Sequence, residues 1–126
     1  MRVLACLEEK ELGFEFIPVN LRAGESKNEP FLSLNPFGQV PVLEDGDSKL
    51  FESMAITKYI AYTYAKNGTP LISQDPKKMA MECVWMEVES QRYENAAAAK
   101  LTWELCIKPN RGMAPDDDDK YEFVLI

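Results

Sequence analysis

Apolar and charged residues recur at helical spacing at the start of the chain. Val3 and Leu7 fall on one face of a helix, whereas Lys10 and the glutamates before it fall on the opposite face. The pattern predicts a helix over residues 2–12. Gly13 is expected to end it, because glycine commonly takes the left-handed position that follows a helix.

Shorter elements follow this helix. Apolar and polar residues alternate from Phe14 to Val19, which predicts a short strand. The polar stretch from Asn20 to Pro30 is expected to be a loop with at most one helical turn. Phe31 to Leu34 forms a second short apolar element.

A β-hairpin and a helix are predicted next. The short apolar runs Val40–Leu43 and Lys49–Phe51 are separated by a segment containing Asp45-Gly46, and Asp-Gly between two such runs is a strong local signal for a hairpin. Ser53 is expected to act as the N-cap of the following helix, because serine hydroxyls satisfy the backbone N–H groups of a first turn. Gly68 marks the end of that helix.

A long helix is predicted to start at Asp75-Pro76, since proline is favoured in the first turn. The pattern could extend to Lys108, with a weaker patch at Ser90–Asn95 that would bend it. The order of elements predicts an α/β unit followed by the start of an all-α domain. The α/β unit has a thin sheet, since a parallel partner for the predicted strand is missing. The predicted boundaries are a first domain at 1–68, a linker at 69–76, helices at 77–113 and a divergent acidic and apolar tail at 114–126.

The composition narrows the range of functions. Of the 126 residues 46% are hydrophobic, and the formal charge of −7 argues against binding to nucleic acid or to an anionic membrane surface. No apolar run approaches the roughly 20 residues that span a bilayer. The first ten residues lack the features of a signal peptide. A cytoplasmic protein is expected.

Cysteine and histidine usage limits the chemistry further. Cys6, Cys83 and Cys106 show no metal-binding spacing, and each lies among apolar residues, which favours a buried thiol in a reducing compartment. The chain contains no histidine, which excludes Ser-His and Cys-His nucleophile pairs and argues against a typical zinc site. No metal is therefore expected.

Two features of the hairpin region predict a binding site. Pro41 cannot donate a ladder hydrogen bond, and a cis bond before it would turn the N–H and C=O of Val40 outward toward a peptide-like ligand. Ser53 lies at a helix N-terminus, where a carboxylate can bind. Taken singly, each feature has a structural alternative: Pro41 as a trans loop residue and Ser53 as a cap alone. Together they describe a pocket for a small, anionic, peptide-like molecule.

The same residues carry a family resemblance. The run Pro30–Pro41 followed by Phe51-Glu52-Ser53 resembles a glutathione S-transferase, most closely the plant phi class, and the likeness extends through Arg22–Glu25 and Val84–Glu89. It covers roughly residues 2 to 113. The resemblance implies a thioredoxin-like, glutathione-binding N-terminal domain followed by the start of an all-α C-terminal domain.

The resemblance also implies the roles of individual residues. Gln39 and Val40 would bind the cysteinyl backbone of glutathione beside a cis Pro41, and Glu52 and Ser53 would hold the γ-glutamyl end. These four residues and Pro41 form the core of the expected site.

Two further residues have open alternatives. Lys27 would pair with the glycine carboxylate of glutathione, or it is an ordinary solvated charge. Phe37 would dock into the partner subunit of a homodimer, or it is an ordinary core phenylalanine.

The sequence departs from the family pattern in several places. The family has a strand and a loop with a catalytic serine just before the helix that here starts at Arg2, so no residue of this chain is assigned to catalysis. Ser26, where phi-class members usually have histidine, and Cys6 are the nearby groups that could substitute. Met54 replaces a common arginine. The run Asp116–Lys120 resembles an enteropeptidase recognition site, or it is an acidic solvated tail.

Three alternative hypotheses about function follow from the resemblance. The first is a transferase that joins the glutathione thiolate to hydrophobic electrophiles in detoxification, with activity impaired by the missing serine. The second is a non-catalytic glutathione-binding or dimer-partner protein. The third is an unstable truncated product.

Overall fold

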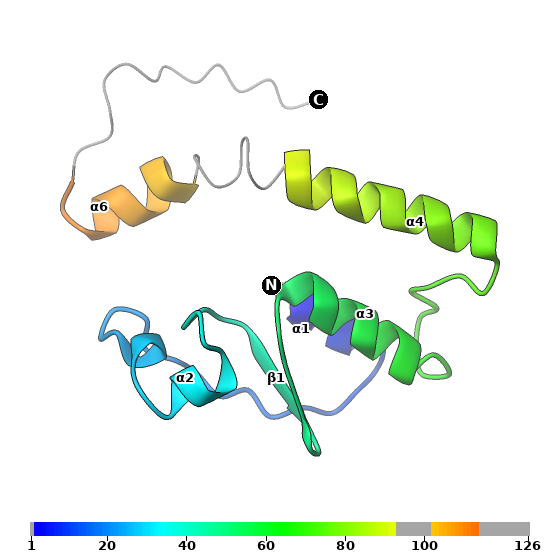
Figure 1. Ribbon diagram of the computed structural model, residues 1–126, viewed down its shortest axis with the longest axis horizontal. Coiled ribbons are helices and arrows are strands. Elements are labelled where there is room, and N and C mark those ends of the chain that lie inside the picture. The colour runs from blue at the N-terminus through cyan, green and yellow to red at the C-terminus, as the bar shows by residue number, and fades with distance from the viewer. Residues whose placement is uncertain (1, 93–101, 114–126) are drawn as a thin grey trace. The chain divides into compact units, whose positions relative to one another are not determined.

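The computed structural model describes residues 2–92 and 102–113. The chain divides into two compact units, Met1–Met79 and Ala80–Ile126. The first unit contains the hairpin and the helices around it, and the described residues of the second unit are mostly helical (Figure 1). The domain and linker boundaries expected from the sequence stay predictions.

The first helix, α1 (Arg2–Glu9), ends earlier than the sequence predicted. Its end is a Schellman motif, in which the N–H of Glu11 donates to the C=O of Glu8 and the N–H of Leu12 donates to the C=O of Leu7. The left-handed residue of this motif is Glu11, with φ 53°, and the prediction that Gly13 ends the helix was wrong.

The prediction that Lys10 lies on the polar face of this helix was wrong. The side chain is fully buried, and its ammonium Nζ donates to the C=O of Asn67 at 3.1 Å. Lys10 comes seven positions after Val3 and three after Leu7, and its N–H donates to the C=O of Cys6 as in a helix, so helical spacing places it on the buried face. There its charge is satisfied by a carbonyl that accepts its hydrogen bond. Helical spacing alone could not reveal that partner.

The core of the first unit lies between α1 and α3 (Ser53–Thr63). Its buried members are apolar side chains that recur at helical spacing on the two facing helices: Val3, Cys6, Leu7, Ile56 and Ile60. The predicted burial of Cys6 is confirmed. This packing stabilises the unit by removing the apolar faces of both helices from water.

The strand predicted at Phe14–Val19 is not formed. The segment has no ladder partner among the described residues, and Phe16 and Ile17 are 66% and 69% exposed. A strand requires a neighbour to satisfy its N–H and C=O groups, and alternation in the sequence does not supply one.

Two short helices follow. The single helical turn expected between Asn20 and Pro30 is the 3₁₀-helix η1 (Glu25–Lys27), and the second short element is α2 (Phe31–Leu34). These two helices contact each other. The Glu29–Pro30 peptide between them is cis, which the sequence reading did not anticipate.

The predicted hairpin is confirmed, with shifted ends. Strands β1 (Val42–Asp45) and β2 (Ser48–Phe51) pair antiparallel around the predicted turn. The first strand begins two residues later than the pattern suggested, so Val40 and Pro41 precede the ladder instead of belonging to it. In Figure 1 the second strand leads up into the start of α3.

A carboxylate at the hairpin turn connects it to α3. The hydroxyls of Tyr59 and Tyr64 donate to the same oxygen, Oδ2 of Asp45, at 2.9 and 2.6 Å. These hydrogen bonds lower the pKa of the Asp45 carboxyl, the contribution of Tyr64 being the larger, and the bond to Asp45 raises the pKa of Tyr64. The pair of tyrosines thus holds the turn against the helix.

The long helix α4 (Pro76–Val88) starts where the sequence predicted. The Asp75 carboxylate accepts hydrogen bonds from the N–H groups of Lys77 and Lys78 at 2.8 and 3.1 Å, which is the expected cap ahead of a proline in the first turn. The predicted α-helix up to Lys108 is wrong in part, since α geometry ends at Val88 and residues 89–92 form a π-helical turn. The predicted bend overlaps this turn.

The remaining described residues form η3 (Trp103–Ile107), a π-helix, and α6 (Lys108–Asn110). The guanidinium of Arg111 lies 5.5 Å from the ring centroid of Trp103, a cation–π contact. The expected helical continuation over residues 93–101 and the acidic tail at 114–126 lie outside the described residues. In the described parts, no helix is long and apolar enough to cross a membrane.

Cys83 was expected to be buried, and this prediction was wrong. Its side chain is exposed on α4, which contains no buried residue in this structure. A small apolar side chain is buried only where a second element packs on its face, and the pattern of one helix cannot show whether that happens. The prediction for Cys106 lies outside what the structure describes.

Candidate functional site

The hairpin register brings the two predicted halves of the site to the same end of the ladder. Val42 pairs with Phe51, the first residue of β1 with the last residue of β2. Paired Cα atoms in an antiparallel ladder lie about 4.5–5.5 Å apart. Pro41 directly precedes one member of this pair and Glu52 directly follows the other, so Val40-Pro41 and Glu52-Ser53 leave the hairpin side by side.

Val40 offers an unused peptide group at this end. Its peptide bond to Pro41 is cis, as the resemblance implied, and the residue is 44% exposed. Within residues 2–92 and 102–113, neither its N–H nor its C=O has a hydrogen-bond partner. A peptide-like ligand could therefore pair with both groups, in the manner of an added strand.

Asn35 holds the peptide group that joins Gln39 to Val40. The Asn35 side chain is 2% exposed; its amide Nδ2 donates to the C=O of Gln39 at 2.7 Å, and its Oδ1 accepts from the N–H of Phe37 at 3.0 Å. Since the Gln39 C=O and the Val40 N–H belong to one planar peptide, fixing the first also orients the second. The sequence reading missed Asn35, although an asparagine before Pro36 is a typical signal for side-chain hydrogen bonds to a turn.

A close backbone approach supports the same loop. Gly38 has φ 59°, and a Cβ at this position would lie 2.5 Å from the backbone oxygen of Ser26. A side chain here would push η1 away from the loop. Gly38 thus allows η1 to lie directly against the segment that presents Gln39 and Val40.

Lys27 lies at this contact. Its ammonium Nζ donates to the C=O of Phe37 at 2.9 Å, and the side chain is exposed. The ammonium retains two further donors, which can reach an anion in solvent. The structure therefore places Lys27 beside the Gln39 loop, on an element different from those carrying Glu52 and Ser53.

Glu52 and Ser53 join β2 to α3. Glu52 has φ 70°, an unfavourable value for a residue with a side chain, and its side chain is exposed. The N-cap position of α3 is Glu52, so the prediction that Ser53 is the N-cap was wrong; Ser53 is the first helical residue. Its Oγ accepts a hydrogen bond from Nη1 of Arg2 at 2.6 Å. Non-glycine residues with positive φ cluster at ligand sites.

The two residues considered as substitutes for a catalytic hydroxyl are both buried. Ser26 is 4% exposed in η1. The Cys6 thiol donates to the C=O of Thr57 at a distance of 3.8 Å, and burial raises its pKa while the charge of Lys10 acts in the opposite direction. Neither side chain presents an accessible or ionised group to a ligand at the hairpin end.

Phe37 is exposed, which disfavours the core alternative. Its side chain is 63% exposed and makes an edge contact with the ring of Phe51, with 6.0 Å between centroids. It lies between Asn35 and Gln39, directly beside the candidate site.

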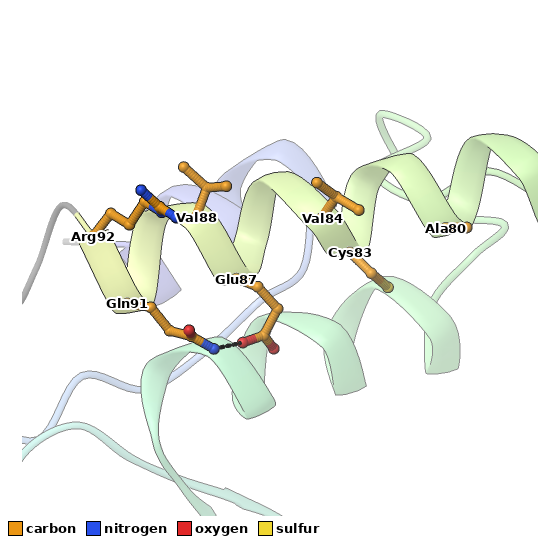
Figure 2. A pocket seen from close by; sticks show the side chains of 7 residues that line it. All are labelled: Ala80, Cys83, Val84, Glu87, Val88, Gln91 and Arg92. Atoms are coloured by element: carbon orange, nitrogen blue, oxygen red, sulfur yellow. Dashed lines mark hydrogen bonds between the residues drawn. The ribbon is translucent and has the colours of Figure 1, made fainter.

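A separate groove runs along α4. Figure 2 shows its seven lining residues projecting from this one helix and its terminal turn, with Nε2 of Gln91 donating to Oε2 of Glu87 at 2.8 Å. None of the predicted site residues lines it. No group of three or more potential metal ligands occurs in the portions of the chain that the structure describes.

Comparisons with known proteins match the part of the chain that contains the candidate site. Residues 1–62 match the family described as glutathione S-transferase, N-terminal domain. The chain is 67% identical over 117 residues to glutathione S-transferase PARB of Nicotiana tabacum, covering 93% of this chain and 54% of that protein. It is 54% identical over 116 residues to glutathione S-transferase F4 of Arabidopsis thaliana, covering 91% and 47%. The chain thus spans about half the length of the curated relatives it matches.

Solved structures to which this chain is similar are also glutathione transferases. Glutathione transferase F7 from Populus trichocarpa superimposes with a TM-score of 0.87 at 51% identity, covering 93% of this chain and 55% of that one. A glutathione S-transferase-I bound with lactoylglutathione superimposes with a TM-score of 0.78 at 38% identity, over 93% and 55%.

Proposed function

This chain belongs to the glutathione S-transferase family, and from that premise we propose that it is a phi-class-like member whose hairpin end binds glutathione. Its fold is the thioredoxin-like α/β fold of the family's N-terminal domain followed by helices, which confirms the predicted fold class. The observation that supports the proposal most is the pairing of Val42 with Phe51, because it brings an unpaired peptide group and a helix start to one place.

Each part of the tripeptide has a chemical counterpart at this end. The Val40 N–H and C=O pair with the cysteinyl backbone, and the Gln39 side chain lies beside them. The Glu52 carboxylate takes the γ-glutamyl ammonium group, and Ser53 with the first turn of α3 takes the γ-glutamyl carboxylate. Lys27, close to the Gln39 loop through its bond to Phe37, takes the glycine carboxylate.

The reaction we propose for the whole protein is the family reaction. The glutathione sulfur forms a bond to an electrophilic carbon of a hydrophobic compound, the thiol proton passes to solvent, and a leaving group departs where the electrophile has one. A free thiol has a pKa of about 8.5, so few molecules are thiolate at neutral pH. The residues of this chain contribute binding and orientation. Detoxification in the cytoplasm is the setting that we propose.

We also propose a homodimer in which Phe37 contacts the partner subunit. The exposure of its ring at the edge of the loop supports this assignment, since a large apolar side chain in that position is available to a partner.

A second function is supported by the burial of Ser26 and Cys6. With neither group available to polarise the sulfur, the described residues can hold glutathione without activating it. In this version the chain is a binding or dimer-partner protein.

One experiment separates the two versions. Glutathione binding by the full chain is measured by calorimetry, and turnover is measured with an aryl halide electrophile. Binding with turnover supports the transferase, and binding without turnover supports the second version. Ser53→Ala should weaken binding, whereas Ser48→Ala, an exposed serine at the far end of β2, should not. Absence of binding by the unmodified chain would overturn both.

A further inference from the structure

Arg2 and Ser53 form a hydrogen bond between residues 51 positions apart in sequence. Nη1 of Arg2 lies 2.6 Å from Oγ of Ser53, and Arg2 is half-buried. A bond this short from a charged donor is stronger than an ordinary hydrogen bond between neutral groups. Arg2 is the first residue of α1 and Ser53 the first residue of α3, so the bond connects two helix starts.

The packing of the helices fixes this pair. One turn further along both helices, the Cys6 thiol donates to the C=O of Thr57, so α1 and α3 run in the same direction with their starts together. The shared core of Val3, Leu7, Ile56 and Ile60 lies between them. The position of the guanidinium relative to Ser53 is therefore set by a packed core and not by a loop.

The hydrogen bond from Arg2 determines whether the Ser53 hydroxyl donates or accepts a hydrogen bond with a ligand. A serine oxygen has two lone pairs and one hydrogen. Because one lone pair accepts from the guanidinium, and because the positive charge repels another donor, the hydroxyl is left to donate its own hydrogen. It is thereby suited to an anionic acceptor such as a carboxylate and poorly suited to an ammonium group. The neighbouring Glu52 carboxylate has the opposite preference.

We propose that Arg2 is a positioning residue that acts through Ser53 and makes this part of the site selective for the α-carboxylate of the γ-glutamyl group. The inference rests on the proposed function, since it concerns one end of the same ligand. The next residue, Met54, carries no charge, so Arg2 supplies positive charge at the start of α3 from another helix.

The test uses three ligands and the full chain. The ligands are glutathione, 4-aminobutyryl-cysteinyl-glycine, which lacks the α-carboxylate, and glutaryl-cysteinyl-glycine, which lacks the α-amine. Arg2→Gln should weaken glutathione binding by about 10- to 100-fold, the effect of removing a hydrogen bond and charge that serve a charged group. It should weaken the ligand without the amine by a similar factor and change the ligand without the carboxylate by less than about twofold.

The variants include matched controls. Arg2→Lys keeps the charge and should restore part of the affinity for both carboxylate-bearing ligands. The double variant of Arg2→Gln with Ser53→Ala should lose less than the product of the two single effects, because the residues act as a unit. Arg22→Gln, at an exposed loop position, makes the same change in charge and should leave all three affinities unchanged. Thermal unfolding of each variant verifies that it folds, and Arg2→Met, which also removes the charge, replaces Arg2→Gln if the latter does not.

The outcomes separate the two proposals. An equal loss for all three ligands would show that Arg2 only stabilises the fold, and unchanged glutathione affinity in Arg2→Gln would remove any role for it; both overturn this inference and leave the proposed function intact. Failure of the unmodified chain to bind glutathione would overturn the proposed function and, with it, this inference.

Discussion

Glu11 adopts a backbone conformation that is unfavourable for a residue with a side chain. It takes the left-handed position of the Schellman motif after α1, with φ 53°. A residue with a Cβ loses roughly 1–2 kcal/mol there, whereas glycine loses roughly 0.5–1 kcal/mol through the greater freedom of its unfolded chain. We therefore expect Glu11→Gly to raise the free energy of unfolding by about 1 kcal/mol, measured by urea denaturation.

Glu8→Gly is the matched control for this change. Glu8 is exposed within α1, and its replacement removes the same charge but inserts glycine into a helix, which should lower stability by about 0.5–1 kcal/mol. Equal effects of the two substitutions would contradict the assignment of Glu11 as the left-handed residue of the motif.

Asn35 is the second residue whose substitution we expect to affect the protein, in both its stability and its binding of glutathione. Asn35→Ala would leave the Gln39 C=O and the Phe37 N–H without their buried partner. Loss of such bonds should destabilise the chain by about 1–3 kcal/mol and weaken glutathione binding, because the Val40 peptide is no longer held. Ser33→Ala removes an exposed hydroxyl that donates to the nearby Pro30 carbonyl, and should change both quantities little. Unchanged affinity in Asn35→Ala would argue against a role for this peptide group in the site.

The contact between the hairpin and α3 is expected to depend on pH. The tyrosine hydrogen bonds lower the pKa of Asp45, so this contribution to stability is complete above the unfolded-state pKa of about 4 and is lost as pH falls through the lower folded-state pKa. The pKa of Tyr64 is raised, so its contribution is complete below pH of about 10 and is lost at higher pH.

Tyr64→Phe tests this interpretation. The variant should show a shallower fall in stability below pH 4 or so than the parent, measured as urea midpoints across a pH series. Asp45→Asn should flatten the same limb. Tyr62→Phe, which removes a hydroxyl from an exposed position of α3, serves as the control. Identical acid limbs in the parent and Tyr64→Phe would contradict the role of this contact.

The elements that the sequence predicted correctly depend on local signals. Asp45-Gly46 marks a turn within four residues, and Asp75-Pro76 marks a helix start within one turn, so neither requires knowledge of distant neighbours. The strand at Phe14–Val19 requires a ladder partner, which its own pattern cannot provide.

The same distinction applies to the site. The motif containing Gln39, Val40 and Ser53 is readable because its residues are close in sequence and resemble a family. Arg2 and Lys10 were missed as structural partners because they meet Ser53 and Asn67 from more than 50 positions away. The charge of each was visible, but its partner depends on how α1 packs against α3.

At the scale of the whole molecule, apolar exposure and net charge have opposite effects on association. The segment after α1, which has no regular secondary structure, exposes several large apolar side chains, those of Phe14, Phe16 and Ile17. An unpaired segment of this kind can add to a strand of another chain. The formal charge of −7 repels a second copy at long range, although salt at physiological strength screens this repulsion beyond about 8 Å.

We therefore expect the chain to self-associate reversibly, more strongly as salt increases. Sedimentation equilibrium in low and moderate salt should give masses above the 14.3 kDa of one chain. Replacing Phe16 and Ile17 together by lysine should reduce association, because charges on an exposed segment prevent strand addition. Phe37→Ser distinguishes this contact from the homodimer proposed above, since it removes an apolar side chain outside the segment. If the lysine variant associates like the parent while Phe37→Ser does not, the loop at Phe37 and not the segment after α1 joins the copies.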